Sequence, residues 1–410
     1  MRQLVLALSQ RNFRLYFIGQ GASLVGTWMQ TIALSWLVYR LTGSPFMLGL
    51  ASFAGQIPIL LLAPFGGVWS DRIHRHRAMF LTQALSLLPA AVLAGLAFAG
   101  RAEVWHLLAA AGFLGVVNAF DTPLRQAFLL DLVGSREHLP TAIALNSAML
   151  NGSRLIGPAL AGLILSWSSE AWCFLLNALS YLAMIAALAL MRLAAPATGR
   201  ARSNWLRGIE EAVRFAWGFA PMRNLIGLVA LVSFVASSYS SLMPVFARDI
   251  LGGDAHTFGN LMGASGAGAL GGVLLLAVRK TTFGLERLIA AAGLCAGTGL
   301  LLFSLSRAPW LSLAIVPFIG FGIILVAASA NTIIQLVAPE AMRGRLVSLH
   351  ITAFLGVMPL GSLAFGLLAE RFGAPAAVAT GGALCLLGAA AFASQLRFMR
   401  ELLDPHYARK

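Results

Sequence analysis

Asp121, Arg125 and Arg154 are charged residues that fall deep inside long apolar runs of this sequence. A charge in such surroundings is unfavourable unless it is paired or hydrated. Asp121 and Arg125 are four residues apart, which is about one helical turn, and Pro123 between them removes a backbone donor. Arg154 lies in the next apolar run at a similar depth. The set suits a carboxylate that binds and releases a proton while an arginine balances its charge.

Two hypotheses for these charges remain open. In the first, the ionic groups form a buried pair that only fixes one helix against the next. Alternatively, Asp121 carries a proton, and Arg154 or Arg125 compensates its charge when the proton has left. His350 is a second titratable candidate in an apolar run, although a lone histidine there is more often a structural hydrogen-bonding residue.

Uncharged polar side chains are scattered through the same apolar runs. Each one taken alone is better explained as a hydrogen bond between helices. Their joint placement favours a cavity for small molecules that have both polar and apolar parts. The cavity candidates are Gln20, Gln30, Asn118, Asn146, Asn151, Tyr239, Asn331 and Gln335.

A polar connection after the second apolar run carries Gly67, Asp71, Arg72 and Arg75. The arginines alone would suit any loop that stays on the cytoplasmic side of a membrane. Such a loop gives no reason for Asp71, so the combination indicates a motif with a role of its own.

A second motif occupies the run that contains Arg154. It consists of Gly152, Gly157, Pro158 and Gly162. Small residues let two helices approach closely, and a proline inside a helix permits a bend or hinge. Ordinary close packing of membrane helices is the simpler explanation of the same residues.

The elements that position these residues must be helices that cross a membrane. The chain has 410 residues, of which 59% are hydrophobic and only 11% are charged, whereas a soluble protein carries about a quarter charged residues. Apolar runs long enough to span a bilayer need about 20 residues. Twelve such runs are predicted, at residues 15–38, 46–69, 78–100, 104–130, 141–166, 171–191, 222–247, 256–278, 286–306, 309–335, 345–369 and 374–396.

The basic residues predict the orientation of these spans. With the N-terminus inside, 22 of the 29 Lys and Arg residues fall in cytoplasmic segments and five in external ones. Positive charge is retained on the cytoplasmic side, so both termini are expected there. The net charge of +14 is therefore explained by membrane topology, and no nucleic acid partner is expected. With short loops throughout, the pattern fits a multi-pass protein of a bacterial inner membrane.

A long connection and an internal repeat divide the chain into two halves. A shift of 204 residues places Gly152, Gly157 and Gly162 on Gly356, Gly361 and Gly366. Between the halves, residues 205–217 have apolar side chains at helical spacing and predict an amphipathic helix on the membrane surface. We therefore expect six-helix bundles at residues 1–192 and 222–410, joined by a cytoplasmic linker at residues 193–221.

The Gly67, Asp71, Arg72 and Arg75 motif, the helix count, the linker and the repeat together resemble the major facilitator superfamily. The resemblance implies an all-α membrane fold of twelve helices in two six-helix bundles, in which helices one, four, seven and ten line a central cavity. It also implies that the loop motif holds a cytoplasmic gate shut. His74 stands where the family usually has glycine and His76 where it usually has a basic residue.

Two local features narrow the resemblance. The Gly-Pro motif at residues 152–162 is similar to one that exporters and antiporters of the superfamily carry in the fifth helix. The sequence from Gly26 to Ser44 is similar to that of the transmembrane secretion effector branch, which includes drug and siderophore exporters. The resemblance implies export of small amphipathic or lipophilic compounds by alternating access, with proton antiport as the energy source. Proton-coupled uptake and export of an anionic siderophore are the alternatives.

Other function classes are less well supported by the sequence. An enzyme would need a nucleophile with its base, a carboxylate pair or clustered metal ligands, and the sequence offers no HExxH motif, phosphate-binding loop or Cys/His cluster. A standing channel gives no reason for a repeat with a gate-like loop. We expect a monomer whose partners are a small-molecule substrate and the lipid bilayer, with no cofactor and no metal.

Overall fold

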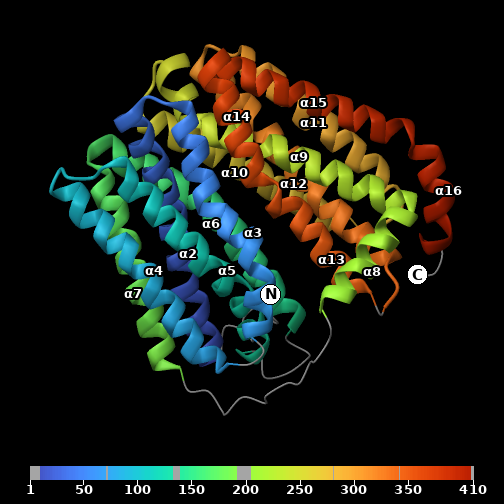
Figure 1. Cartoon of the computed structure of the whole chain (residues 1–410), viewed down its shortest axis with the longest axis horizontal. Coiled ribbons are helices and arrows are strands. Elements are labelled where there is room, and N and C mark those ends of the chain that lie inside the picture. The colour runs from blue at the N-terminus through green and yellow to red at the C-terminus, as the bar shows by residue number, and fades with distance from the viewer. Residues whose placement is uncertain are drawn as a thin grey trace. The chain divides into compact units, whose positions relative to one another are not determined.

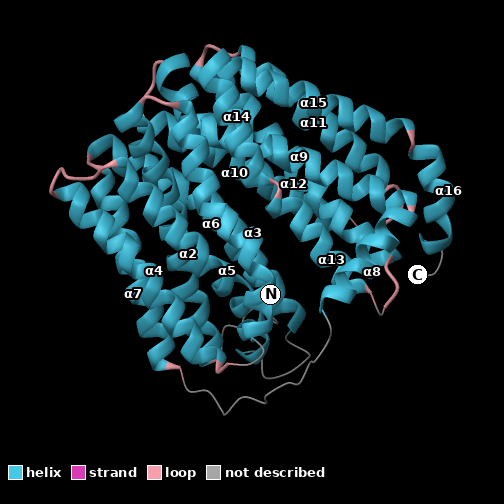
Figure 2. Ribbon diagram, in the orientation of Figure 1, coloured by secondary structure: helices cyan, strands magenta, loops and turns pink. Residues whose placement is uncertain are grey.

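The computed structural model describes residues 10–70, 73–132, 139–191, 205–279, 281–340 and 342–407, and these residues form helices and short connections without a strand (Figures 1 and 2). Apolar runs form helices because a helix satisfies its backbone polar groups internally. The helices are α2 (Arg11–Thr42), α3 (Pro45–Ser70), α4 (Arg75–Phe98), α5 (Val104–Leu132), α6 (Leu139–Trp167), α7 (Glu170–Leu190), α8 (Trp205–Gly218), α9 (Ala220–Val245), α10 (Ala255–Val278), α11 (Leu285–Leu305), α12 (Pro309–Val337), α13 (Arg343–Ile351), α14 (Met358–Phe372), α15 (Ala374–Ser394) and α16 (Leu396–Tyr407).

Each of the twelve predicted spans corresponds to helical structure. Within the described ranges, eleven helical stretches are long and apolar enough to cross a membrane. The span predicted at residues 15–38 corresponds to α2, which is 32 residues long but does not belong to these eleven. Polar residues such as Asn12, Gln20 and Gln30 dilute its apolar character. The all-α membrane fold is confirmed.

The outer surface of the helices is apolar, as a lipid-facing surface must be. Leu61, Leu88, Phe318 and Leu387 are each more than half exposed. Exposed tryptophans gather near helix ends, where amphipathic rings suit the boundary between lipid and water. Trp167, for example, is 84% exposed at the end of α6.

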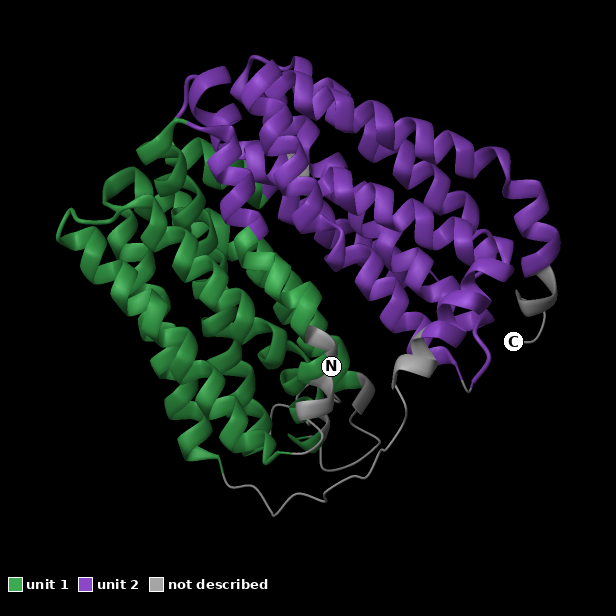
Figure 3. Ribbon diagram, in the orientation of Figure 1, with its two compact units in different colours: residues 1–43, 54–201, 254–263 green, residues 44–53, 202–253, 264–410 purple. Residues whose placement is uncertain are grey.

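Two compact units make up the chain, and each one is discontinuous in sequence (Figure 3). Unit 1 comprises residues 1–43, 54–201 and 254–263, and unit 2 comprises residues 44–53, 202–253 and 264–410. Helix α3 therefore contributes its first turns to unit 2 and its remainder to unit 1. Helix α10 is divided in the same way, with its first turns in unit 1.

The span predicted at residues 345–369 is not one regular helix. It consists of α13, a π-helical segment η2 (Thr352–Gly356) and α14. Pro359 stands at the start of α14, where its missing N–H leaves no bond unmade. A second π-helical segment, η1 (Phe246–Ile250), extends α9. Such segments often occur at functional positions in helices.

Two amphipathic helices complete unit 2. The predicted linker helix at residues 205–217 corresponds to α8, and α8 contacts α13, where Glu211 accepts a 2.6 Å bond from Arg345. Helix α16 follows α15 and buries Met399 and Leu403, while the guanidinium of Arg400 lies 4.7 Å from the ring centre of Phe283.

Candidate functional site

Asp121 on α5 lies at the centre of a buried polar cluster in unit 1. Its carboxylate is paired with Arg125 one turn further along the same helix. Helix α4 supplies two further donors, since Thr82 Oγ1 lies 2.7 Å and Gln83 Nε2 lies 3.1 Å from Oδ1 of Asp121. Asp121 is 1% exposed. Three side chains, those of Arg125, Thr82 and Gln83, thus donate to this buried carboxyl group.

Helix α2 is the third helix, after α5 and α4, that contributes side chains to the cluster. Ser23 donates to Oε1 of Gln83 at 3.4 Å, and the ring of Tyr16 packs edge-on against Phe128 at 6.0 Å between centroids. Several buried polar atoms of unit 1 have no hydrogen-bond partner within the described chain. They are Tyr16 Oη, Gln20 Oε1, Arg125 Nε and Asn146 Oδ1. Among these atoms, Arg125 Nε belongs to the ion pair itself, so the pair keeps one donor that no described side chain uses.

Arg154 is placed by the Gly-Pro stretch of α6. Its guanidinium lies 5.4 Å from the ring centre of Trp28 on α2. A cation over an indole face is stabilised by the ring quadrupole. In the structure, Arg125 pairs with Asp121, whereas Arg154 contacts the indole ring of Trp28. The hypothesis that Arg154 balances the charge of Asp121 stays a prediction.

Glycines of the Gly-Pro motif make unequal contacts. A Cβ at Gly157 would lie 2.4 Å from Cβ of Trp28, so α6 approaches α2 as closely as only glycine permits. A Cβ at Gly162 would lie 2.9 Å from Cα of Gly259 in the first turns of α10. A Cβ at Gly152 would meet nothing within 4 Å. Two of the three glycines are thus explained by close packing within unit 1.

Half of the loop motif lies within the described residues. Gly67 belongs to the last turns of α3, and Arg75 starts α4, where its guanidinium donates to Asp131 of α5 at 2.8 Å. Asp71 and Arg72 lie outside the described residues. Gly66, the residue before the motif glycine, makes a close contact, since a Cβ there would lie 2.3 Å from the carbonyl oxygen of Ala119.

The remaining cavity candidates have varied surroundings. In unit 1, Gln30 accepts from Asn177 at 2.7 Å, and Asn151 donates to the Ser147 carbonyl of its own helix at 2.8 Å. Asn118 is half-buried on α5. In unit 2, Tyr239 is hydrogen-bonded to Ser265, as expected for bonds between helices.

Asn331 and Gln335 lie one turn apart on α12 of unit 2. Oδ1 of Asn331 is buried and has no partner within the described chain, whereas Gln335 is exposed. Asn331 therefore offers an acceptor to a ligand, and Gln335 lies near the helix end.

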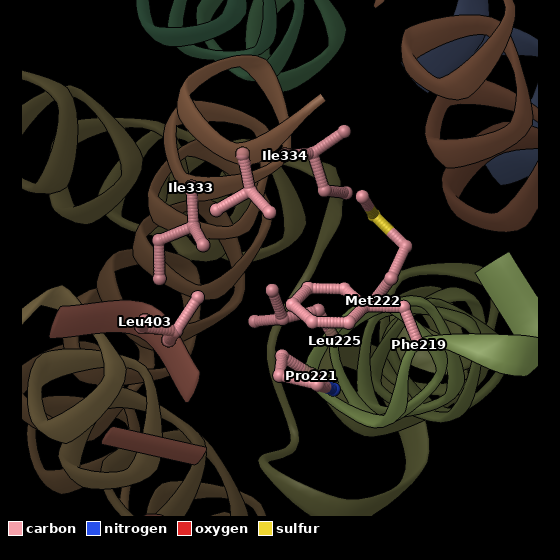
Figure 4. A pocket seen from close by; sticks show the side chains of 8 residues that line it. Phe219, Pro221, Met222, Leu225, Ile333, Ile334 and Leu403 are labelled. Carbon is pink, nitrogen blue, oxygen red and sulfur yellow. The ribbon is translucent and has the colours of Figure 1, made fainter. Parts of the chain in front are cut away.

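A pocket in unit 2 is apolar and small (Figure 4). It lies between the start of α9, the end of α12 and α16. Its lining consists of Phe219, Pro221, Met222, Leu225, Ile333, Ile334, Val337 and Leu403. No group in this lining could activate a bond or hold a metal. Among the described residues, no three His, Cys, Asp or Glu side chains are grouped as metal ligands.

Thr82, Gln83 and Tyr16 join the site although sequence reasoning did not single them out. Thr82 and Gln83 are adjacent polar residues in the run predicted at 78–100. Two adjacent polar residues in an apolar run could have marked this position in the sequence. Only the packing of α4 against α5 shows that both side chains reach Asp121.

Comparisons with known proteins agree with this architecture. The sequence profile described as transmembrane secretion effector matches residues 5–405. A staphyloferrin A transporter of Staphylococcus aureus (strain NCTC 8325 / PS 47) is 25% identical over 85% of this chain and 87% of its own length. The multidrug efflux pump Tap of Mycolicibacterium fortuitum is 25% identical over the same shares, 85% and 87%. Macrolide efflux protein A of Streptococcus pyogenes is 25% identical over 88% and 90%.

Solved structures support the fold alone. A POT family transporter in complex with a thioalcohol-conjugated peptide superposes with a TM-score of 0.73 at 12% identity, over 94% of this chain and 96% of that one. The profile match covers nearly the whole chain, and the helical architecture is that of the same superfamily. The chain therefore belongs to the transmembrane secretion effector family of the major facilitator superfamily, and it is a multi-pass membrane transporter rather than an enzyme.

Proposed function

We propose that this transporter exports small amphipathic or lipophilic compounds from the cytoplasm of a bacterium and exchanges them for protons. The observation that carries the proposal is the Asp121 cluster. A carboxylate that is 1% exposed, with a paired arginine and two neutral donors on another helix, has the parts needed to exchange a proton when its surroundings change.

Relatives support export more than uptake. One relative is named a multidrug efflux pump and another a macrolide efflux protein. The Gly-Pro stretch of α6, which is similar to a motif of exporters and antiporters, packs closely against α2 at Gly157. Apolar membrane helices with few charges favour substrates that are themselves amphipathic or lipophilic.

In the proposed cycle, the six-helix bundles at residues 1–192 and 222–410 alternate the access of a central site between the two sides of the inner membrane. Gly67, Asp71, Arg72 and Arg75 form the cytoplasmic gate. The ion pair between Arg75 and Asp131 at 2.8 Å supports a role for this end of α4 in holding helices together. The protein works as a monomer with both termini in the cytoplasm, and it needs a proton gradient but no cofactor.

Export of an anionic compound is a second candidate. It is favoured by the relative named a staphyloferrin A transporter. Arg154 over Trp28 offers a cation for an anionic group on the substrate. In this version the substrate, rather than Asp121, would engage Arg154.

Transport by inside-out vesicles tests the coupling. Vesicles that carry the wild-type protein should accumulate a fluorescent amphipathic dye when the vesicle interior is made more acidic than the outside. Asp121→Asn should abolish gradient-driven accumulation, because an amide cannot bind and release a proton at this site. Asp249→Asn is the matched control, since Asp249 is about half exposed in η1, and it should transport like the wild type. Undiminished accumulation by Asp121→Asn would show that the coupling proposal is wrong.

A further inference from the structure

The first turns of α3 are bound to α14 through a carboxylate. Residues 44–53 belong to unit 2, as α14 does, whereas the rest of α3 belongs to unit 1. Glu370, near the end of α14, accepts hydrogen bonds from the hydroxyl of Ser44 at 2.8 Å and from the backbone N–H of Phe46 at 3.1 Å. The first N–H groups of a helix have no partner within it, and the helix dipole favours an anion there. Glu370 therefore supplies α3 with a cap from another helix.

Two glycines bring the same helices together about one turn further along each of them. A Cβ at Gly49 would lie 2.4 Å from the carbonyl oxygen of Ser362, and a Cβ at Gly366 would lie 3.0 Å from Cα of Gly49. Small residues let the backbones of membrane helices approach this closely. Because glycine has no side chain, separating the two helices at this point exposes little apolar surface.

Serine hydroxyls add a further set of bonds to the contact. Oγ of Ser52 on α3 lies 3.0 Å from Oγ of Ser362 on α14, and Ser241 of α9 donates to Ser362 at 3.2 Å. Ser362 is fully buried. A hydroxyl both donates and accepts, so water can take the place of each of these partners when the helices separate. The bonds from Ser44 and Ser52 to α14 are therefore of a kind that can form and break.

The repeat-related contact in unit 1 has the glycines but lacks the carboxylate. The shift of 204 residues that places Gly162 on Gly366 also places Ser166 on Glu370. Gly162 of α6 likewise meets a glycine at the start of another helix, since a Cβ there would lie 2.9 Å from Cα of Gly259 in α10. Ser166, however, donates to a carbonyl of its own helix at 2.7 Å. The carboxylate that joins two helices is thus present at one of the two related contacts.

The start of α10 is capped by a residue next to it in sequence. Oδ1 of Asp254 accepts the backbone N–H of Thr257 at 3.0 Å, which is the usual bond of a helix cap. At the start of α3, Ser44 makes a similar bond with the N–H of Met47 at 3.2 Å. The bond from Phe46 to Glu370 comes in addition to this local cap. Capping of α3 alone therefore does not explain Glu370, and a role between helices does.

We propose that Ser44 and Ser52 of α3, together with Ser362 and Glu370 of α14, form an external latch that closes and opens in each transport cycle. The proposal rests on the function proposed above, and it names residues that position a helix for that function. On the predicted topology, the α2–α3 and α14–α15 connections both face the outside of the cell. Alternating access requires contacts at that side to break when the central site opens outward. Glu370 holds the start of α3 while the site faces the cytoplasm.

A disulfide within the external latch tests whether the contact must open. In a background with the three native cysteines replaced, copper phenanthroline should oxidise Ser52→Cys with Ser362→Cys to a disulfide, because the two Oγ atoms are 3.0 Å apart. In proteoliposomes, the oxidised protein should transport a fluorescent amphipathic dye at least about 10-fold more slowly than the reduced protein, because a closed contact prevents alternating access. Dithiothreitol should restore the rate.

The matched control pair is Ser306→Cys with Ser312→Cys. Oγ of Ser312 lies 2.9 Å from Oγ of Ser306, within unit 2 and on the same predicted side of the membrane. These residues flank the short connection between α11 and α12, so their disulfide should leave the transport rate unchanged. The external latch is refuted if no disulfide forms between positions 52 and 362, or if that disulfide leaves transport as fast as in the reduced protein.

Modification of Ser362→Cys measures the contribution of Glu370 without transport. Position 362 is fully buried in the closed contact, so a membrane-impermeant maleimide added to intact cells should modify it slowly. Glu370→Ala should raise this rate by about 3- to 10-fold, which is the contribution of one or two net hydrogen bonds. Glu370→Gln keeps an acceptor oxygen and should raise the rate by less than about twofold. Equal rates with Glu370 and with Glu370→Ala would show that Glu370 does not hold the contact.

The modification assay uses neither a dye nor a gradient, so it separates the external latch from the proposed function. A wild type that transports nothing against a proton gradient but shows the Glu370-dependent rate retains the latch and refutes proton-coupled export. Gradient-driven transport that continues in the disulfide-linked protein refutes the latch and retains export.

Discussion

At the scale of residues, the ion pair of Asp121 and Arg125 contributes to stability and also belongs to the proposed coupling site. Two charges leave water when the pair is buried, and their attraction with the bonds from Thr82 and Gln83 offsets that loss. Removing one partner leaves the other charge uncompensated, whereas removing both leaves a neutral site. The structural part of the pair can therefore be measured apart from transport.

Arg125→Met alone should destabilise the protein by about 3 to 5 kcal/mol, because it leaves the Asp121 carboxylate buried without its cation. The double variant Asp121→Asn with Arg125→Met should be more stable than Arg125→Met alone. Chemical unfolding of the protein in detergent, followed by tryptophan fluorescence, measures both. If the two single changes were simply additive in the double variant, the charges would not interact as an energetic pair.

Sequence reasoning identified Asp121 and Arg125 because charge inside an apolar run is conspicuous. It did not identify Thr82, Gln83 and Tyr16, since neutral polar residues are common in membrane helices and only packing selects those that meet. Glycine roles were also hard to assign, because adjacent residues face different directions. In the motif of α6, Gly157 and Gly162 make close contacts, whereas a Cβ at Gly152 would meet nothing within 4 Å.

At the scale of elements, α6 is fitted to α2 through one glycine. The backbone of α6 approaches Trp28 so closely at Gly157 that a Cβ would lie 2.4 Å from the Cβ of Trp28. Gly152 on the same helix faces open space. The two glycines therefore offer a matched comparison of close packing and intrinsic helix propensity.

Gly157→Ala should destabilise the protein by about 1 to 3 kcal/mol, because the added methyl group forces α6 away from α2. Gly152→Ala should be neutral or stabilising by up to about 1 kcal/mol, since alanine favours a helix over glycine. The midpoint of thermal unfolding in detergent measures both effects. Equal midpoints for the two variants would contradict the close contact at Gly157.

Helix positions could be predicted well because long, mostly apolar runs form helices in a membrane, where the backbone must bond internally. The irregular part of the span at 345–369 could not be predicted, since a π-helical segment leaves the hydropathy of a run unchanged. Helix α16 was also missed. It is short and carries charged residues, so its apolar face became visible only where Met399 and Leu403 pack into unit 2.

At the scale of the whole molecule, the distribution of basic residues predicts how the chain is oriented in the membrane. Arg101 is exposed in the connection between α4 and α5, and Gln395 is exposed just after α15. The positive-inside rule places the first outside the cell and the second in the cytoplasm.

Labelling of single cysteines tests this orientation. In a background with Cys173, Cys295 and Cys385 replaced, Arg101→Cys should react with a membrane-impermeant maleimide added to intact cells. Gln395→Cys should react only after the membrane is opened. Labelling of Gln395→Cys in sealed cells would reverse or abolish the assigned topology, and the cysteine-free protein serves as the blank.

The sharing of α3 between the compact units has a consequence for fragments of the chain. Gly49 packs against the backbone of α14, and Ser44 and the backbone of Phe46 both donate to Glu370. A polypeptide that stops before the linker keeps these first turns of α3 but loses the helix that receives them. A polypeptide that starts at the linker has the receiving helix and an unused carboxylate. Neither piece is thus a self-sufficient folding module, and a gene cut at the linker yields two products that each lack part of a hydrophobic interior.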